Sequence, residues 1–307
     1  DVVKRYDVDG IHFDYIRYPE ESIANGYSGD KISMNRFQSE EGNPDKLNRQ
    51  DWQRDQINKF ISNIYDSIKS VKPYIKMSAA VIGNFSKGNW NGFNSVYQDA
   101  STWCKNKKVD FIVPMSYFKL EHFTGAMAEW KSIINKEDIY PGLAAYKSDE
   151  WGWSEIWNEI TYTRENGFQG FVMFAINSLN KVWKQLKEEQ LPSWANIPES
   201  KYIKSIPDKV SHLTAIRMDE NRVKVEWEVS ESNKDCYYNV YQAGNGRFTS
   251  KVENELIFVT ARNVSYFIDE TKEDYEYSVS ALNRYNIEGE VSKPAIINKK
   301  ELTKMDK

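Results

Sequence analysis

The residues best suited to chemistry stand close together near the start of the chain, in the run VDGIHFDYIRYP at positions 8–19. The run has the apolar character of a buried strand, and polar and aromatic groups follow at its end: Asp14, Tyr15, Arg17 and Tyr18. Barrel enzymes build their active sites from groups at the carboxyl ends of parallel strands. A central strand at position 8 leaves no room ahead of it for neighbouring strands, so we expect the chain to be the second part of something larger.

Alternation within this strand predicts which side chains would face a cleft. Alternate residues of a strand share a face, so His12 and Asp14 point one way while Ile11 and Phe13 point the other. If the apolar pair packs against helices, Asp14 lines the barrel axis near its top, where a carboxylate can act as a nucleophile or stabilise an oxocarbenium-like transition state. His12 could hydrogen-bond Asp14 or a sugar hydroxyl. The alternative is that Asp14 caps a loop and that His12 is satisfied in the core.

Arg17 also has two interpretations. A guanidinium beside Asp14 would keep that carboxylate ionised, or it would only buttress the loop. Tyr15 and Tyr18 flank Arg17, and aromatic rings suit the flat C–H faces of sugars. The chain has 10 Trp and 19 Tyr, and we expect most of these rings to belong to the core or to interfaces.

Short apolar runs and amphipathic stretches alternate along the first part of the chain. Five runs have the length and β-propensity of strands buried on both faces of a parallel sheet; they span 8–14, 75–83, 109–116, 139–145 and 170–176. Helical spacing of apolar residues follows each run, at 51–71, 92–107, 123–135, 154–166 and 178–190. The sequence therefore predicts an α/β fold.

The expected architecture is a (β/α)8 TIM-type barrel that is N-terminally incomplete, because a complete barrel needs eight strand-helix units and about five are present. An open doubly wound sheet is the alternative, but no glycine-rich phosphate loop follows the first strand. Long polar loops at 20–50 and 84–95 lie after strand ends and favour a barrel with a cleft.

The pattern changes after about residue 190. Three prolines between 191 and 208 fit a stiff linker, and beyond them apolar residues alternate with polar ones, as in an antiparallel all-β sandwich. Residues 209–298 resemble a fibronectin type III domain. The likeness is carried by Trp227, Tyr238-Asn239-Val240-Tyr241, the alternating Tyr275, Tyr277, Val279, Ala281 and Asn283, and Gly289.

The resemblance implies that Tyr275 is the tyrosine-corner residue and that this domain spaces or docks a partner. We expect no chemistry there. The expected organisation is a partial barrel at 1–195, a linker at 196–208, the fibronectin type III-like domain at 209–298 and a tail at 299–307.

Residues 6–19 resemble the bacterial glycosyl-hydrolase-like family 10, whose members carry a comparable Asp-Gly-Ile-His-Phe-Asp segment on the fourth strand of a (β/α)8 barrel. The runs VPMSY at 113–117 and GFVMF at 170–174 are similar to that family's sixth and eighth strands. The resemblance covers roughly residues 1–190. It implies hydrolysis of a glycan, with bacterial cell-wall polysaccharide as one substrate class, and an extracellular or cell-envelope location. Many members have a second Asp where this chain has Tyr15.

Glycoside hydrolysis ordinarily uses two carboxyl groups, about 5 Å apart for retention or about 6.5 to 9.5 Å apart for inversion. No other expected strand ends in Asp or Glu. The loop candidates for the acid are Glu121, Asp149 and Glu150. We expect instead that the partner carboxylate belongs to a missing upstream strand, in which case this chain hydrolyses little by itself.

Other expected sugar contacts lie at strand ends and in the loops that follow them. Polar side chains there can hydrogen-bond sugar hydroxyls; these are Asn84, Ser116, Tyr117 and Asn177. Rings in the loops could stack on sugars; these are Trp90, Tyr146, Trp151 and Trp153. The alternative for each Trp is that it anchors its loop.

Composition excludes several classes of partner. The net charge is −4, with Lys and Arg evenly spread, which argues against nucleic acid. No apolar stretch approaches the roughly 20 residues that span a bilayer. The three histidines are too scattered for a metal site, so we expect no metal and no cofactor. Cys104 and Cys236 fall in different expected domains, and a disulfide between them is not expected.

Two further classes of protein remain open. One is a non-catalytic glycan-binding protein that keeps the aromatic cleft without a working acid. The other is an envelope scaffolding protein, for which Trp227 and its neighbours would have to form an exposed apolar patch. In an incomplete barrel the strands at 8–14 and 170–176 would be unpaired edges. We therefore expect an oligo- or polysaccharide as ligand, and either the missing N-terminal barrel segment or self-association at these edges, with poor solubility of the chain alone.

Overall fold

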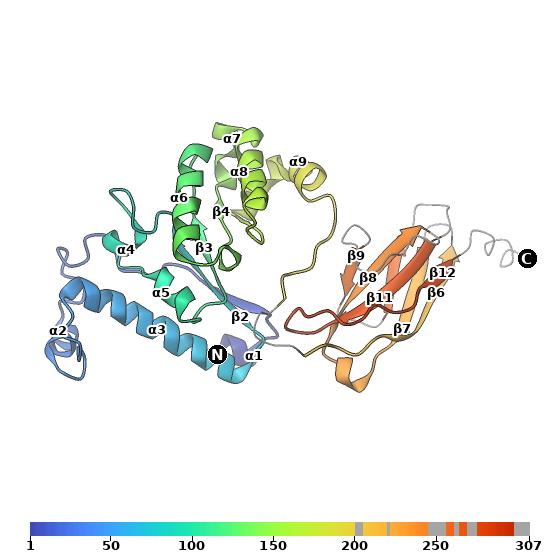
Figure 1. Cartoon of the computed structure of the whole chain (residues 1–307), viewed down its shortest axis with the longest axis horizontal. Coiled ribbons are helices and arrows are strands. Elements are labelled where there is room, and N and C mark those ends of the chain that lie inside the picture. Colours follow the sequence, from blue (N-terminus) through green and yellow to red (C-terminus); the bar gives the residue numbers. More distant parts are fainter. Residues whose placement is uncertain (200–204, 220–221, 245–255, 261–263, 269–274, 298–307) are drawn as a thin grey trace, which may run out of the picture. The chain divides into compact units, whose positions relative to one another are not determined.

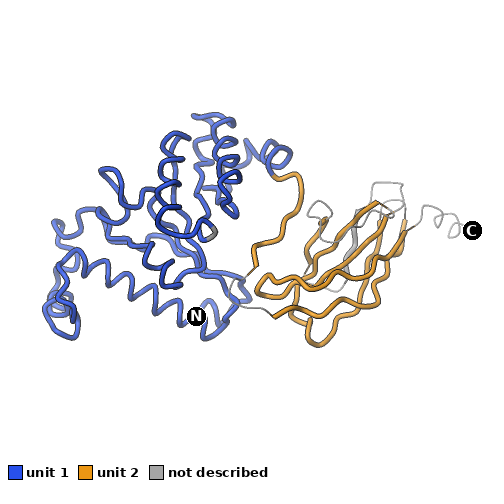
Figure 2. The backbone as a smooth tube through the Cα atoms, viewed as in Figure 1, with its two compact units in different colours: residues 1–190 blue, residues 191–307 orange. Residues whose placement is uncertain are grey.

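The structure is a computed structural model that describes residues 1–199, 205–219, 222–244, 256–260, 264–268 and 275–297. The chain divides into two compact units, residues 1–190 and 191–307 (Figure 2). The division lies slightly before the expected boundary at residue 195.

The first unit contains a parallel sheet whose five strands are arranged in the order β1-β2-β3-β4-β5. Their bounds are β1 (Gly10–Phe13), β2 (Lys76–Ile82), β3 (Phe111–Met115), β4 (Gly142–Leu143) and β5 (Val172–Met173). A doubly wound sheet reverses its strand order at a switch point. Sequential order with right-handed crossovers instead places every crossover helix on the same face. The sequential strand order therefore excludes the doubly wound alternative. The curled sheet is consistent with part of a (β/α)8 barrel.

The main crossover helices lie on the outer side of this sheet in Figure 1. They are α3 (Arg49–Val71), α5 (Ala100–Lys105), α6 (Leu120–Ile133) and α8 (Trp153–Glu165), joined by the shorter α1 (Val2–Arg5), α2 (Lys31–Gln38), α4 (Gly92–Ser95), α7 (Ser148–Trp151) and α9 (Trp183–Gln185). Asn48 caps the longest helix, α3, and its side chain accepts a hydrogen bond from Asp51 N at 3.0 Å. Such a cap satisfies an amide that has no partner within the helix.

The core of this unit shows which face of the sheet the helices cover. Met77 and Val81 of β2 are fully buried in the same apolar cluster as Ile61 of α3, and Ile11 and Phe13 of β1 pack against that cluster. Because successive side chains of a strand point to opposite faces, the residues between them face the other way. The predicted orientation of Ile11 and Phe13 toward the helices is confirmed.

Two predicted helices are broken. The stretch 92–107 forms α4 and α5 rather than one helix, because the side chain of Asp99 accepts a hydrogen bond from Thr102 N and starts a new helix there. The stretch 178–190 consists of a 3₁₀ turn (Ile176–Lys181), α9 and a π-helical segment (Leu186–Gln190).

The predicted strands at 139–145 and 170–176 are also longer than those observed, since β4 and β5 have two residues each. Here the backbones approach closely. A Cβ atom at Gly142 would lie 2.8 Å from the carbonyl oxygen of Pro114, so a glycine is required at the start of β4.

The second unit is an antiparallel sandwich of two sheets, β10-β7-β6 and β12-β11-β8-β9. The strands are β6 (Ser211–Asp219), β7 (Arg222–Glu228), β8 (Tyr237–Gly244), β9 (Leu256–Thr260), β10 (Val264–Ile268), β11 (Tyr275–Leu282) and β12 (Ala295–Ile297). The corner that Tyr275 would form reaches back toward 269–274, which lie outside the described residues, as does the expected tail at 299–307.

Trp227 belongs to the core of this sandwich. It is 2 % exposed, and its ring centroid lies 5.2 Å from that of Tyr238. The exposed patch around Trp227 that the scaffolding alternative requires is therefore not formed.

Sheet edges and single residues complete the description. Among the described strands, β1 and β5 each pair with one neighbour only. Cys104 and Cys236 form no disulfide with each other. Within the described residues, the search for a helix of membrane-spanning length and apolarity finds no candidate.

Candidate functional site

Asp14 stands directly after the carboxyl end of β1 and is exposed. One of its carboxylate oxygens accepts a hydrogen bond from Tyr15 N at 2.7 Å. Tyr15 has φ 56°, a left-handed conformation that is uncommon for a residue with a side chain, and its ring is 75 % exposed. The turn therefore leaves the carboxylate at the surface, with the Tyr15 ring beside it.

His12 lies two residues before Asp14 on the same strand. Its Nδ1 atom is 2.8 Å from Ser78 Oγ, which occupies the paired position on β2. Partial burial lowers the pKa of His12, and the negative charge of Asp14 opposes this shift. The imidazole is consequently neutral at pH 7, and it bonds Ser78 rather than Asp14.

Three rings lie in contact just after the ends of β3, β4 and β5. We term them the aromatic cluster: Tyr117, Tyr146 and Phe174. The ring centroids of Tyr117 and Phe174 lie 5.6 Å apart at 22°, and Tyr146 meets both edge-on. Burial raises the pKa of Tyr117 to about 12, and the charges of Asp14 and Tyr146 add to the shift. The negative charge of Asp14 therefore reaches the Tyr117 hydroxyl, which stays protonated at neutral pH.

Phe174 is absent from the residues singled out in the sequence. It is 53 % exposed and ends the run GFVMF, so the rule that selected Tyr117 and Tyr146 by their place after strands would also have selected it. The residue predicted at that strand end was the polar Asn177, which is exposed in the following 3₁₀ turn.

Glu129, a buried residue of α6, holds the loop after β2 by hydrogen bonds. A single oxygen of Glu129 accepts from Ser86 N at 3.1 Å, Ser86 Oγ at 2.8 Å and Lys87 N at 3.1 Å. Asn84 Oδ1 of this loop lies 3.0 Å from Nε2 of His122 in α6. Trp90, also in this loop, is 42 % exposed. The loop thus presents the Asn84 amide and the Trp90 ring from an anchored backbone.

Several expected contacts have structural partners of their own. Ser116 is fully buried and donates its hydroxyl to Pro114 O, so its side chain is not open to a ligand. Trp153 Nε1 donates to Glu189 at 2.9 Å, and the residue packs against the core, which makes it an anchor. Trp151 is half-buried and donates to Glu150 at 3.3 Å.

Tyr18 and Arg17 also have partners in the folded chain. The Tyr18 ring meets Tyr97 edge-on at 6.3 Å, and its hydroxyl accepts from Ser28, so this residue holds the loop. Of the two interpretations of Arg17, the pairing with Asp14 is not formed within the described residues, and the Arg17 guanidinium lies 4.5 Å from the centre of the Tyr15 ring. A ring face attracts a cation in this way.

Two of the three loop acids considered as partners of Asp14 are paired with lysines. Asp149 pairs with Lys181, and Glu150 pairs with Lys147 at 2.6 Å. Glu121 is exposed in the first turn of α6. Within the described residues no group of three His, Cys, Asp or Glu is placed to hold a metal ion.

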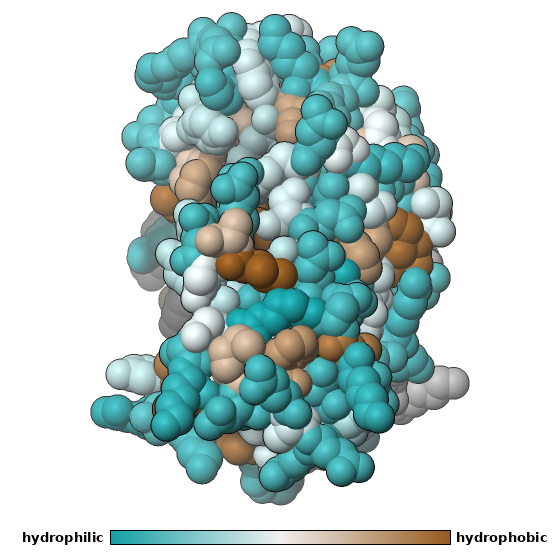
Figure 3. All heavy atoms as spheres, turned by 90° about the vertical axis from the view of Figure 1, so that its left-hand side faces the viewer, coloured by the Kyte–Doolittle hydropathy of each residue, from teal (hydrophilic) through white to brown (hydrophobic). Residues whose placement is uncertain are grey.

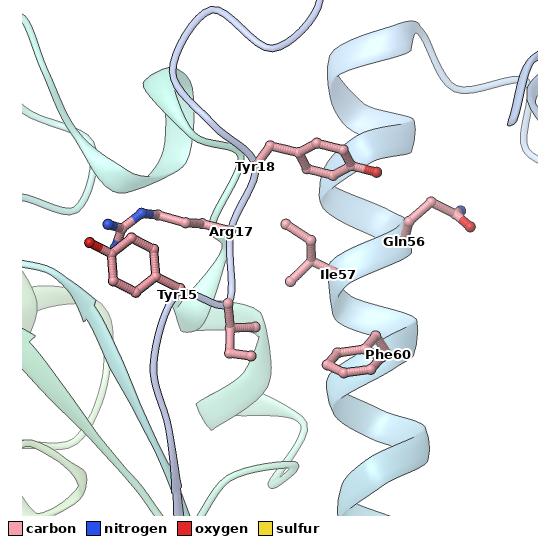
Figure 4. A pocket seen from close by; sticks show the side chains of 7 residues that line it. Tyr15, Arg17, Tyr18, Gln56, Ile57 and Phe60 are labelled. Carbon is pink, nitrogen blue, oxygen red and sulfur yellow. The ribbon is translucent and has the colours of Figure 1, made fainter. Parts of the chain in front are cut away.

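A cavity of about 370 Å³ adjoins the turn after β1 (Figure 4). It is lined by Tyr15, Ile16, Arg17, Tyr18, Gln56, Ile57 and Phe60. In Figure 4 the Tyr15 and Arg17 side chains extend together away from α3, and Tyr18 extends toward it. Figure 3 shows one face of the molecule, in which apolar groups gather at the middle of a largely hydrophilic surface.

Among the described residues, these features define a strand-end site with one carboxylate and flanking rings, a lining suited to a sugar-sized ligand. Comparison with known families supports a glycosyl hydrolase-like protein: residues 1–153 match the family Glycosyl hydrolase-like 10.

Two curated relatives share this part of the chain. Glycosyl hydrolase YngK of Bacillus subtilis is 25 % identical over 331 residues, which cover 95 % of this chain and 63 % of the relative. Glycosyl hydrolase DigH of Escherichia coli K12 is 24 % identical over 166 residues, covering 49 % of this chain and 36 % of the relative. The chain thus spans less than two thirds of the length of either relative.

Solved structures are similar to part of the chain, with low scores. "Structure of FN3tt mut" has a TM-score of 0.25 and 15 % identity, covering 31 % of this chain and 98 % of that chain. An Fn3-like protein from Clostridium thermocellum has a TM-score of 0.24 and 24 % identity, covering 30 % and 92 %.

Proposed function

We propose that this chain forms part of a glycoside hydrolase that acts on a polysaccharide, with bacterial cell-wall glycan as the substrate class, outside the cell or in its envelope. Asp14 is the proposed catalytic carboxylate, as nucleophile or as stabiliser of the oxocarbenium-like transition state. The observation that carries the proposal is the exposed Asp14 at the end of β1, close enough to Tyr117 of the aromatic cluster for its charge to raise the Tyr117 pKa.

The neighbouring groups have complementary roles in this proposal. The aromatic cluster stacks on a sugar ring, and the Tyr117 hydroxyl, protonated at neutral pH, donates a hydrogen bond to the bound sugar or to Asp14. Neutral His12, held by Ser78, fills the layer below Asp14.

A second carboxyl group is required for ordinary glycoside hydrolysis. Asp14 alone provides one at the described strand ends, while Asp149 and Glu150 are engaged with lysines. We propose that polypeptide pairing with the open edge of β1 or β5 supplies the second group.

The test is Asp14→Asn, assayed by release of reducing ends from cell-wall glycan, in this chain and in the complete gene product. The isosteric amide removes the charge, and we expect a rate loss of about 100-fold or more. The matched control is Asp149→Asn, which removes an exposed carboxylate that pairs with Lys181, and this variant should keep the rate. Unchanged hydrolysis by the Asp14→Asn protein would overturn the assignment.

A non-catalytic glycan-binding protein is the second candidate, favoured by the single carboxylate among the described strand ends. In that case the complete gene product would retain glycan chains and release no reducing ends, and Asp14→Asn would leave that retention unchanged.

A further inference from the structure

We infer that His122 is a positioning residue, which turns the Asn84 amide so that its Nδ2 group donates a hydrogen bond to a neutral oxygen of a bound saccharide. This inference rests on the proposed function and adds a binding group to the same site. It starts from two side chains that lie 38 residues apart in the sequence and meet in the fold.

The contact between these two side chains fixes the direction of the amide. Nε2 of His122 lies 3.0 Å from Oδ1 of Asn84, which is the length of a hydrogen bond. An amide oxygen only accepts, so the imidazole donates from Nε2. Among the described residues Asn84 Nδ2 has no hydrogen-bond partner, and it is not a buried atom. The amide therefore keeps a donor open to a ligand.

The imidazole is itself held in one orientation. The rings of His122 and Phe118 stack with centroids 4.0 Å apart and planes 4° apart. Phe118 in turn packs against the core of the unit. A Cβ atom at Gly83 would lie 2.8 Å from a carbon of the Phe118 ring, so the glycine makes room for that ring. The stack limits the rotation of the His122 ring and keeps Nε2 directed at Asn84.

The backbone on either side of the amide is tied down as well. Trp130 Nε1 donates to Gly83 O at 2.7 Å, and Gly92 N donates to Asn84 O at 3.0 Å. The main freedom left to Asn84 is the rotation of its side chain, and the bond from His122 removes it. A donor that is fixed before a ligand arrives loses little conformational entropy when the ligand binds.

The position and chemistry of the amide suit a sugar. Asn84 follows β2, which pairs in parallel with β1, so it lies after the carboxyl end of the strand next to the one that Asp14 follows. Trp90 in the same loop is exposed and offers a ring face to a sugar. The amide donor carries no charge, and it matches the neutral oxygens of a saccharide, which are its hydroxyls and acetamido carbonyls.

The experiment is calorimetric binding of the chain to two neutral oligosaccharides, one from cell-wall glycan with acetamido groups and one from cellulose with hydroxyls only. Asn84→Ala should lower affinity about 5- to 10-fold. A loss confined to the first oligosaccharide identifies the acetamido carbonyl as the acceptor, and a loss for both identifies a hydroxyl. His122→Phe keeps a ring against Phe118 without the donor and should weaken binding about 3- to 10-fold. His122→Gln, which keeps an N–H near the position of Nε2, should restore most of the affinity.

The double variant decides whether His122 acts through Asn84. Asn84→Ala combined with His122→Phe should bind no more weakly than Asn84→Ala alone, because the positioning residue has nothing left to position. Additive losses would place His122 against the sugar itself and overturn the inference. His212→Phe makes the same change at an exposed histidine of β6 and should keep the affinity.

An NMR measurement tests the direction of the bond without any ligand. Long-range ¹H–¹⁵N correlations of neutral His122 should place its hydrogen on Nε2. A hydrogen on Nδ1 alone would mean that the Asn84 amide is turned the other way, with Nδ2 bound to the imidazole, and would overturn the inference.

The outcomes separate this inference from the proposed function. Equal affinity of Asn84→Ala and the wild type overturns the role of the amide and of His122 alone. The expected coupling, without release of reducing ends by the complete gene product, overturns the enzymatic proposal alone. Failure of the wild-type chain to bind either oligosaccharide overturns the inference, whereas the enzymatic proposal is decided by the Asp14→Asn assay.

Discussion

His12 Nδ1 and Ser78 Oγ lie 2.8 Å apart and join β1 to β2 on the face of the sheet turned away from the helices. The pair fixes the imidazole two residues from Asp14, whose charge reaches it. A histidine held in this way reports on the electrostatics of the site.

The first prediction concerns the titration of His12. Partial burial disfavours the imidazolium, so the pKa of His12 should lie below 6.5, and Asp14→Asn should lower it further because a negative charge that favours the cation is removed. NMR titration of the ring protons measures this, with His122→Asn and His212→Asn variants for assignment. Asp149→Asn should leave the value unchanged, and a His12 pKa that rises in Asp14→Asn would contradict the geometry.

The second prediction concerns Phe174. Truncation to Ala removes one ring of the aromatic cluster, and we expect affinity for an oligosaccharide to fall about 5- to 20-fold, equivalent to about 1–2 kcal/mol of stacking. Because the ring is 53 % exposed, the fold should survive. Tyr6→Ala, at a similarly exposed ring ahead of the amino end of β1, is the control for calorimetry. Equal affinities of both variants and the wild type would refute a stacking role.

The third prediction concerns the anchored loop after β2. Glu129→Ala leaves Ser86 N and Lys87 N without their acceptor, and we expect stability to fall by about 1–3 kcal/mol. Hydrogen exchange should quicken at residues 84–91, and glycan affinity should drop if Trp90 contacts sugar. Glu121→Ala removes an exposed acid from the same helix and should change neither quantity. Unaltered exchange in Glu129→Ala would show that the loop is held by other contacts.

The fourth prediction concerns Glu159, a fully buried residue of α8 whose two carboxylate oxygens have no hydrogen-bond partner among the described residues. Burial raises its pKa from 4.5 to about 8, and the charge of Glu155 adds to the shift. In the unfolded chain this carboxyl ionises near pH 4.5, whereas in the fold it resists ionisation. The free energy of unfolding should therefore decrease as pH rises from about 4.5 to about 8, by up to a few kcal/mol.

Glu159→Gln keeps the shape of this side chain without the titration. The variant should be more stable than the wild type by a margin that grows between pH 5 and pH 8, as measured by urea unfolding of the chain. Glu165→Gln, exposed at the end of the same helix, should show no such trend. A margin independent of pH would mean that Glu159 is not the titrating group.

Much of this fold follows from local pattern. Short β-branched runs separated by amphipathic stretches predict a parallel sheet with outer helices, and alternation within residues 10–13 places Ile11 and Phe13 against those helices. Period-two alternation after the prolines predicts the sandwich in the same way. Hydrophobic periodicity depends on neighbours along the chain, so a single sequence contains it. Asp99 shows the limit, because the cap that divides one amphipathic stretch into two helices depends on the hydrogen bonds of one side chain.

By itself, the sequence determined which residues end the strands and which face of each strand they share. Only the tertiary structure decided what those residues do. It buried Ser116, used Trp153 as an anchor, gathered Tyr117, Tyr146 and Phe174 into one cluster and placed the Arg17 guanidinium over the Tyr15 ring. Burial and pairing depend on atoms brought together from distant positions, and the spacing of residues along one strand carries no information about them.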